Sequence, residues 1–213
     1  MEILDALMPL LSEGFINITK VFFLTLVLSI PLSIPVAMAR LSKNKILSKL
    51  VGMYIYLMRG TPLLLQLMFI FFGLPLLPGA ITLDRFTAIY VAFILNYTAY
   101  LSEIFRGGIQ SIDKGQWEAA KVLGVSKPYT FIKIILPQAF SKVVPAVSNE
   151  VINLVKDTSL TYILGIMDLL KAARSISNTM ASIVPYVIVG IIYLIIIAVL
   201  TYILDKVERK AQY

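Results

Sequence analysis

The sequence predicts an all-α polytopic membrane protein with five transmembrane helices. Three observations predict this fold class: 59% of the 213 residues are hydrophobic, only 15% are charged, and the mean hydropathy is +0.87. Soluble domains carry about 25% charged residues, so this composition is typical of a chain embedded in lipid. Internal repeats and linker-like stretches are absent from the sequence. We therefore expect a single transmembrane domain over residues 1–213.

Five apolar runs are long enough to cross a bilayer, since a spanning helix needs about 20 apolar residues. Backbone breaks are expected within two of them, because proline removes a helical hydrogen bond. We expect Gly60-Thr61-Pro62 to interrupt the second run, and Pro137 and Pro145 to interrupt the fourth. Pro31 and Pro35 are expected only to curve the first. The predicted spans are residues 15–39, 51–72, 86–105, 134–155 and 184–204.

The distribution of charge predicts how these spans are oriented. Lysine and arginine follow the first and third spans and close the chain, whereas the first fourteen residues carry three acidic residues and neither lysine nor arginine. By the positive-inside rule, the N-terminus lies outside and the C-terminus inside. The net charge of +7 therefore reflects the orientation of the spans, and it also attracts anionic lipids of the bilayer. We expect no nucleic-acid partner.

Several kinds of chemistry are excluded by residues that the sequence lacks. The chain contains neither cysteine nor histidine, which removes disulfides, thiolate metal sites and imidazole catalysis. No G-x-x-x-x-G-K-[ST] loop occurs, so ATP hydrolysis of the P-loop kind is not expected in this chain. We expect no enzyme activity, no metal and no cofactor here.

The segment after the third span contains a short helix, predicted over residues 115–125. Good helix formers precede Gly124, a natural C-terminal stop, and Pro128 suits the first turn of a following helix. Trp117, Ala120 and Gly124 fall on one face, with a large ring at one end and small residues along it. Two interpretations remain open: a helix floating at the lipid headgroups, or a docking element for a cytoplasmic partner.

Two polar stripes run along predicted spans. Glu150, Asn153 and Asp157 share one helix face in the fourth span, with Asn149 beside them and Lys156, Thr158 and Ser159 following. The third span carries Asn96, Tyr100 and Glu103 on one face, with Tyr97 adjacent. Such groups in a bilayer usually face a cavity or each other. Asn96 and Tyr97 could equally be hydrogen-bonding contacts between helices.

Each carboxylate in these two stripes has more than one possible cationic partner or position. Glu103 can pair with Arg106 one turn away, and Asp157 can pair with Lys156 or lie at the outer surface. Glu150 has no basic residue three or four positions away, so it needs a cation from elsewhere: Arg59, a second subunit or a transported molecule. A cationic substrate would be met here by a charge-assisted hydrogen bond. The predicted substrate-binding residues are Glu150, Asp157, Asn153, Asn149, Asn96, Tyr97, Thr61 and Ser159.

One motif resembles a known family. Glu118-Ala119-Ala120, Gly124, Ile134 and Leu136-Pro137 match every fixed position of the EAA-x3-G-x9-I-x-LP loop of ABC importer permeases. The stretches RGTPLLLQL from Arg59 and VKDTSLTYILGIMDLL from Val155 resemble the polar amino acid branch of that family. The resemblance implies that the predicted short helix docks in the ATP-binding subunit through the coupling residues Trp117, Glu118, Ala119, Ala120 and Gly124.

The resemblance also implies partners. Two permease subunits, identical or different, would pair around a central path in the prokaryotic plasma membrane. Two ATP-binding subunits carrying ATP and Mg would lie beneath them, and a substrate-binding protein would dock outside. The helical spacing of Ile163, Ile166, Met167 and Leu170 predicts a helix packed at that outer face, where Lys171 and Arg174 are exposed lip charges or binding-protein contacts.

The sequence thus predicts the permease subunit of an ATP-driven importer of basic amino acids such as arginine, lysine or histidine. The alternatives are an importer of the same class that carries glutamine or cystine, and an ion-coupled secondary transporter with Glu150 or Asp157 as its proton site. An assembly protein with purely structural polar stripes is a further alternative.

Overall fold

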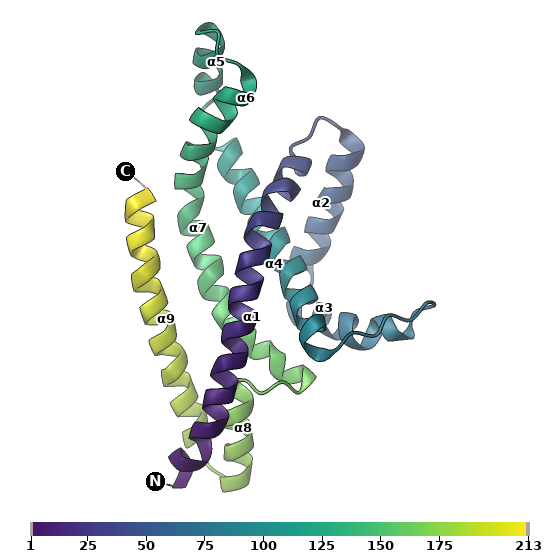
Figure 1. The fold of residues 1–213 in the computed structure, drawn as a ribbon, viewed down its shortest axis with the longest axis vertical. Helices are drawn as coiled ribbons and strands as arrows, with labels where there is room; N and C mark the ends of the chain where they lie inside the picture. Colours follow the sequence, from purple (N-terminus) through teal and green to yellow (C-terminus); the bar gives the residue numbers. More distant parts are fainter. Residues whose placement is uncertain (1, 212–213) are drawn as a thin grey trace.

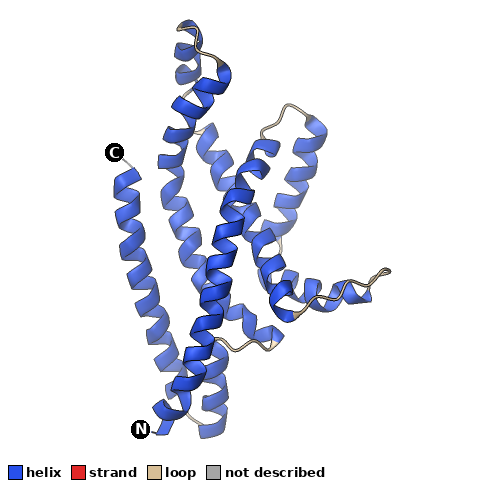
Figure 2. Cartoon of the chain, viewed as in Figure 1, coloured by secondary structure: helices blue, strands red, loops and turns tan. Residues whose placement is uncertain are grey.

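The computed structural model describes residues 2–211 and is helical throughout that range, apart from short connections (Figure 2). Short non-α turns join several of the helices: π-helical turns at Phe69–Gly73 and Phe131–Ile135, and 3-10 turns at Leu74–Leu76 and Thr158–Leu164. The α-helices are α1 (Glu2–Arg40), α2 (Lys45–Gly60), α3 (Leu63–Met68), α4 (Arg85–Gln110), α5 (Lys114–Val122), α6 (Lys127–Thr130), α7 (Leu136–Asp157), α8 (Leu169–Met180) and α9 (Val184–Ala211).

The long helices run roughly side by side and give the molecule two distinct ends (Figure 1). One end carries α5, α6, the connection from α1 to α2 and the end of α9; we call it the α5 end. The other carries α8 and the start of α1, and we call it the α8 end. Four helices are long and apolar enough to cross a membrane, and α2 with the segment 63–76 makes a fifth if the bent pair is one span.

The centre of the bundle is built on α1, α4 and α7. Phe93, Ile89 and Leu154 are fully buried there, together with Val21 and Leu67. In the second half of α1 the buried face is made of small side chains, which let helix backbones approach closely. They are Thr25, Ser29, Ser33 and Ala37. Close approach therefore holds this half of α1 against the rest of the bundle.

The second span is sharply bent, as its Gly60-Thr61-Pro62 sequence predicts. Helix α2 ends at Gly60, α3 begins at Leu63, and the two segments diverge by 105°. Helix α2 starts at Lys45, earlier than the predicted span, because the Asn44 side chain accepts hydrogen bonds from the Ile46 and Leu47 backbone N–H groups. The segment after the bend leaves the bundle sideways instead of continuing along it (Figure 1).

The predicted break at Pro145 is wrong. Helix α7 runs unbroken from Leu136 to Asp157 with Pro145 inside it. Pro137 lies in the first turn of α7, directly after the π-helical turn, where a missing N–H has little cost. The fourth span therefore presents one continuous helix, and its polar stripe keeps its register.

The predicted helix around Ile163 and Met167 is also wrong in its position. Thr158–Leu164 form a 3-10 segment, and Gly165 adopts a left-handed conformation with φ of 77°. Helix α8 begins only at Leu169, after Asp168, whose side chain accepts a hydrogen bond from the Lys171 backbone N–H. Glycine adopts this left-handed conformation without steric cost, so the chain turns here. The spacing of hydrophobic residues does not reveal such a turn.

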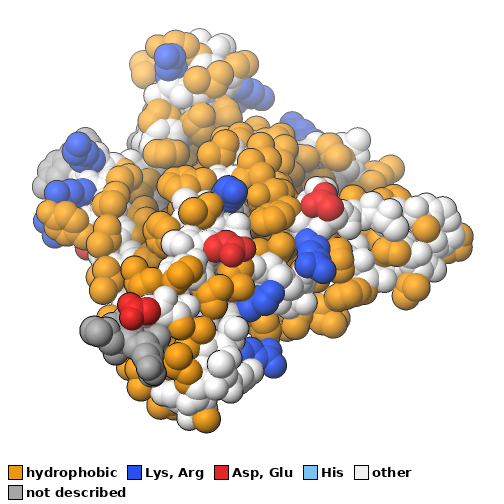
Figure 3. Space-filling view, turned by 60° about the horizontal axis from the view of Figure 1, so that its bottom comes forward, with side chains coloured by type: hydrophobic (Ala, Val, Ile, Leu, Met, Phe, Trp, Pro, Cys, Tyr) orange, Lys and Arg blue, Asp and Glu red, His pale blue; other side chains and the backbone are white. Residues whose placement is uncertain are grey.

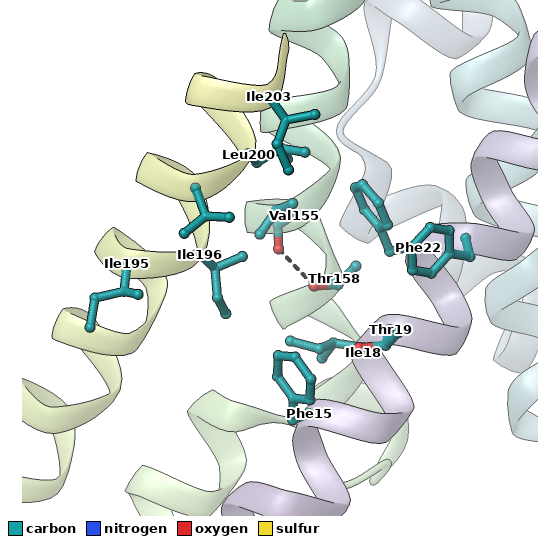
Figure 4. A pocket seen from close by; sticks show the side chains of 12 residues that line it. Phe15, Ile18, Thr19, Phe22, Val155, Thr158, Ile195, Ile196, Leu200 and Ile203 are labelled. Carbon is teal, nitrogen blue, oxygen red and sulfur yellow. Dashed lines mark hydrogen bonds between the residues drawn. The ribbon is translucent and has the colours of Figure 1, made fainter.

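Helix α9 packs against α7 and α8 but leaves a gap beside α1. A cavity of about 350 Å³ lies between α1, α7 and α9, lined by side chains such as Phe15, Phe22, Val155 and Ile196 (Figure 4). Its one drawn polar contact, the Thr158 hydroxyl donating to the Val155 carbonyl, is already satisfied at 2.7 Å. Apart from the hydroxyls of Thr19 and Thr158 its lining is apolar and carries no charge, so this groove is a poor site for a charged solute.

Candidate functional site

A polar cavity of about 610 Å³ lies where the bend of the second span meets α4 and α7. We call it the Glu150 cavity. It gathers ionisable and aromatic side chains from two helices that are far apart in sequence, together with the backbone of the bend. Its lining is Thr61, Pro62, Leu63, Leu64, Asn96, Tyr97, Tyr100, Glu150, Asn153, Lys156, Asp157 and Leu160.

The two carboxylates of this cavity are held differently. Asp157 accepts a hydrogen bond of 2.7 Å from the hydroxyl of Tyr97, which is only 2% exposed. Glu150 is half-buried and, among the side chains that the structure describes, forms no ion pair with Arg59 or any other basic residue. Asp157 likewise forms no ion pair among the described side chains, but it already accepts the Tyr97 hydrogen bond, so Glu150 is the less engaged of the two carboxylates.

Two of the predicted substrate-binding residues are engaged in holding the bend together. Asn96 is 5% exposed and donates through Nδ2 to the Met58 carbonyl and to Gln66 Oε1, at 3.0 Å each. The Thr61 hydroxyl donates to the Leu57 carbonyl and accepts from Gln66 Nε2. Both line the cavity, but their hydrogen-bonding capacity is largely used within the chain.

Sequence reasoning missed Gln66. Its Nε2 lies within hydrogen-bonding distance of the Met58 carbonyl, the Thr61 carbonyl and the Thr61 hydroxyl, at 2.9, 3.1 and 2.8 Å. These carbonyls lose their helical partners at the bend, and buried carbonyls need replacements. A lone amide four residues after Pro62 in an otherwise apolar run is the signal that could have identified it.

The remaining predicted residues are placed as follows. Glu103 pairs with Arg106, and the Arg106 Nε donates to Glu103 Oε2 at 2.9 Å, as the spacing suggested. Asn153 lines the Glu150 cavity with the two carboxylates. Asn149 is exposed, and neither Asn149 nor Ser159 belongs to the lining of that cavity.

The predicted short helix is present as α5, at the tip of the α5 end. Asp113 caps it by accepting a hydrogen bond from the Gly115 N–H, and Gly124 ends it with a φ of 72°. Trp117 stacks on Phe131 with ring centroids 6.4 Å apart, and Ala120 is buried. Residues 117 and 120 therefore face their own chain rather than outward.

The outward face of α5 is formed by other members of the motif. Glu118 and Ala119 are exposed, as is Gly124 after the helix. Val122 and Leu123 are 87% and 79% exposed, which is high for apolar side chains. Exposed apolar side chains grouped beside small residues mark a protein contact surface. We define the α5 contact surface as Glu118, Ala119, Val122, Leu123 and Gly124.

The α8 end is organised by a buried acid. Burial raises the pKa of Asp168 to about 6, although hydrogen bonds from the Lys171 N–H, the Thr161 hydroxyl and the Tyr162 N–H lower it. Seen from this end, basic and acidic side chains lie toward the middle of the face, between hydrophobic areas (Figure 3). Among the described residues, no group of three or more acidic side chains is arranged to hold a metal ion.

Comparisons with known proteins agree with this architecture. The chain is 38% identical over 203 residues to the arginine transport system permease ArtQ of Bacillus subtilis, covering 95% of this chain and 92% of that one. It is also 38% identical to the L-cystine transport system permease TcyB of the same organism, covering 95% and 86%. A crystal structure of an amino acid ABC transporter with histidines matches with a TM-score of 0.88 and 33% identity, covering 95% and 94%.

A family model covers almost the whole chain. It matches residues 9–213 and describes a binding-protein-dependent transport system inner membrane component. Inward-facing structures of the MetNI methionine ABC transporter, at 17% identity, share the fold with a TM-score of 0.73. Because the family model spans far more than half of the chain, the chain belongs to the binding-protein-dependent transport system inner membrane components.

Proposed function

We propose that this chain is the permease subunit of an ATP-driven importer of basic amino acids, with Glu150 receiving the cationic side chain. The observation that carries this proposal is the open carboxylate of Glu150 in a cavity that also contains Asp157. Several relatives are amino acid permeases, and their names include arginine, glutamine and cystine. The chemistry of the cavity has to distinguish among these substrates.

A guanidinium or ammonium entering low-dielectric surroundings loses its hydration and needs a compensating anion. Glu150 supplies that anion as a charge-assisted hydrogen-bond acceptor. Tyr97 and Tyr100 line the same cavity, and the face of a tyrosine ring attracts a nearby cation. Glutamine has no cation beyond its α-ammonium group, and the side chain of cystine is a neutral disulfide. A basic amino acid adds a side-chain cation for the second carboxylate of the cavity, so cationic substrates are favoured over glutamine or cystine.

The α5 contact surface is the part of this chain through which ATP hydrolysis in a partner would drive transport. We propose that it docks in an ATP-binding subunit that carries ATP and Mg, and that closure of two such subunits moves α5 and switches the cavity from inward to outward facing. In this proposal the N-terminus and the α8 end lie outside, where a substrate-binding protein delivers the solute. A second permease subunit, identical or related, completes the membrane unit.

The experiment is ATP-dependent uptake of labelled arginine into vesicles that contain the assembled complex. Unlabelled lysine, histidine, glutamine and cystine serve as competitors, and the assay is repeated with Glu150→Gln. Glu208→Gln near the end of α9 is the matched control, because it makes the same chemical change away from the cavity. We expect lysine and histidine to compete, Glu150→Gln to abolish uptake with the complex intact, and Glu208→Gln to behave as the unaltered protein.

Competition by glutamine or cystine alone would reassign the substrate within the same class of importer. Uptake that persists without ATP and fails when the proton gradient collapses would instead indicate a secondary transporter. A silent Glu150→Gln with strong competition by lysine would remove Glu150 from the proposal and leave the substrate class standing.

A further inference from the structure

A second polar cavity, of about 490 Å³, lies next to the Glu150 cavity and has the opposite charge character. We call it the Arg59 cavity. It contains two guanidinium groups, from Arg40 and Arg59, and one carboxylate, from Glu103. That carboxylate is already paired with Arg106. The lining is Arg40, Gly52, Ile55, Tyr56, Arg59, Gly60 and Glu103.

The two cavities meet at the bend of the second span. Gly60 lines the Arg59 cavity and Thr61, the next residue, lines the Glu150 cavity. On α4, Tyr100 lines the Glu150 cavity, and Glu103, one turn closer to the α5 end, lines the other. Arg59 lies at this junction, with its guanidinium carbon 5.3 Å from the centroid of the Tyr100 ring.

Arg59 has binding capacity to spare. Among the described side chains, its guanidinium forms no ion pair and donates no hydrogen bond to another residue. Arg40, by contrast, donates from Nη1 to the Ser48 hydroxyl at 2.8 Å and lies against Gly52. A guanidinium presents donors in a fixed fork that matches a carboxylate in two parallel hydrogen bonds. The group that fits the Arg59 cavity is therefore an oxyanion.

We propose that Arg59 binds the α-carboxylate of the amino acid as it passes between the two cavities toward the α5 end. This inference rests on the proposed function, in which Glu150 receives the cationic side chain. An amino acid carries both signs of charge, and the Glu150 cavity sets two carboxylates against one ammonium group, that of Lys156, so its net charge repels the α-carboxylate. The neighbouring guanidinium attracts that group, so the two cavities together read both ends of the solute.

The test measures equilibrium binding to the purified complex of permease and ATP-binding subunits. The substrate-binding protein is left out, so that any preference between two ligands comes from the permease. Labelled arginine is displaced by unlabelled arginine or by agmatine, which is arginine without its carboxylate. We expect the unaltered complex to prefer arginine on the order of tenfold or more. Arg59→Gln should weaken arginine binding on the order of tenfold and leave agmatine binding unchanged, so the preference disappears.

Two further variants make the result interpretable. Arg59→Lys keeps the charge without the fork and should recover part of the preference. Arg209→Gln, an exposed arginine in the last turn of α9, is the matched control and should bind both compounds as the unaltered complex does. An equal loss of arginine and agmatine binding in Arg59→Gln, or no preference in the unaltered complex, would overturn the inference.

An anionic lipid headgroup offers the same oxyanion chemistry. The measurement is therefore made in nanodiscs of zwitterionic lipid and again with anionic lipid added. A site for the transported carboxylate gives the same arginine-to-agmatine preference in both, whereas a headgroup site gives a preference that anionic lipid abolishes. Loss of arginine binding in Glu150→Gln reports on the proposed function separately, and failure of the unaltered complex to bind arginine would sink both proposals.

Discussion

The α5 end and the α8 end of this molecule are built in opposite ways. At the α5 end, a nine-residue helix exposes small and apolar side chains and touches its own chain mainly through Trp117 and Ala120. At the α8 end, helix α8 buries Leu169, Ala172, Ala173 and Ile176 and is joined to α1, with the Asn17 amide donating to the Met167 carbonyl at 3.0 Å. The difference teaches that one end leaves apolar side chains uncovered within this chain, as the proposed docking of α5 requires, and that the other is shaped by its own packing.

The sharpest test of this contrast is Gly14 on α1. A Cβ atom at this position would lie 2.6 Å from the backbone carbon of Asp168, so one of the two helices must move. We expect Gly14→Val to lower the free energy of unfolding by about 3 kcal/mol, the upper range for overpacking a close contact. Thermal unfolding in detergent measures it.

Gly107→Ala is the control for that change, because a Cβ there meets nothing within 4 Å and the residue is also helical. It should leave the melting temperature unchanged or raise it slightly. Equal melting temperatures for Gly14→Val and the unaltered protein would contradict the description of the α8 end as tightly packed.

Asp168 gives the packing of the α8 end a pH dependence. Its pKa is raised from 3.8 to about 6, so the folded state holds the proton more tightly than the unfolded state. Stability therefore falls as the pH rises from 3.8 to about 6 and is level above that, by up to roughly 3 kcal/mol in total. Melting temperatures recorded across this range should show the fall.

Replacing the titrating group checks the cause. Asp168→Asn keeps a good helix cap for α8 but cannot titrate, so the part of the slope that Asp168 contributes should vanish. An undiminished slope in Asp168→Asn would assign the dependence to other groups.

Gly124 carries the corresponding test at the α5 end. Aspartate there adds charge to the α5 contact surface at a backbone position with φ of 72°. We expect ATP-dependent uptake to fall about 30-fold, equivalent to about 2 kcal/mol at the centre of an interface, with insertion into the membrane preserved. Gly124→Ala separates the strain of the left-handed conformation, about 1 kcal/mol, from the effect of charge. Normal uptake by Gly124→Asp would remove the coupling role from α5.

The smallest expected effect lies between the two ends, at Tyr97. Removing its hydroxyl takes one hydrogen bond from Asp157 and should cost about 0.6 kcal/mol, the average for such contacts between membrane helices. Tyr54→Phe is the matched control, since its hydroxyl donates to the Leu95 carbonyl at 2.6 Å away from the cavity. Both changes should lower the melting temperature similarly, but only Tyr97→Phe should alter arginine binding; identical binding by the two would place Asp157 outside the site.

The two ends also differ in how far the sequence predicts them. Asp113 caps the start of α5 and Gly124 ends it, so the position of this helix follows from residues that are neighbours in the chain. The α8 end depends on the turn at Gly165 and on a distant contact with Gly14, so periodicity alone misplaced the start of α8.

The Glu150 cavity could be predicted from the sequence only in part. The stripe of Glu150, Asn153 and Asp157 follows from helical spacing, and the structure places all three around one cavity. The engagement of Asn96 with Gln66 could not be predicted, because it exists only once a 105° bend brings the two amides together. Long-range hydrogen bonds of this kind depend on the fold already being formed.

The helical column that begins at Lys127 and ends at Leu164 joins the α5 end to the cavity in one piece of chain. At 1.5 Å per residue its 38 residues extend over about 57 Å. Phe131, the residue on which Trp117 stacks, starts a π-helical turn near one end, and Glu150 and Asp157 lie further along the same column. If α5 moves as proposed, we expect the movement to reach both carboxylates along this one column, through the π-helical turn at Phe131–Ile135.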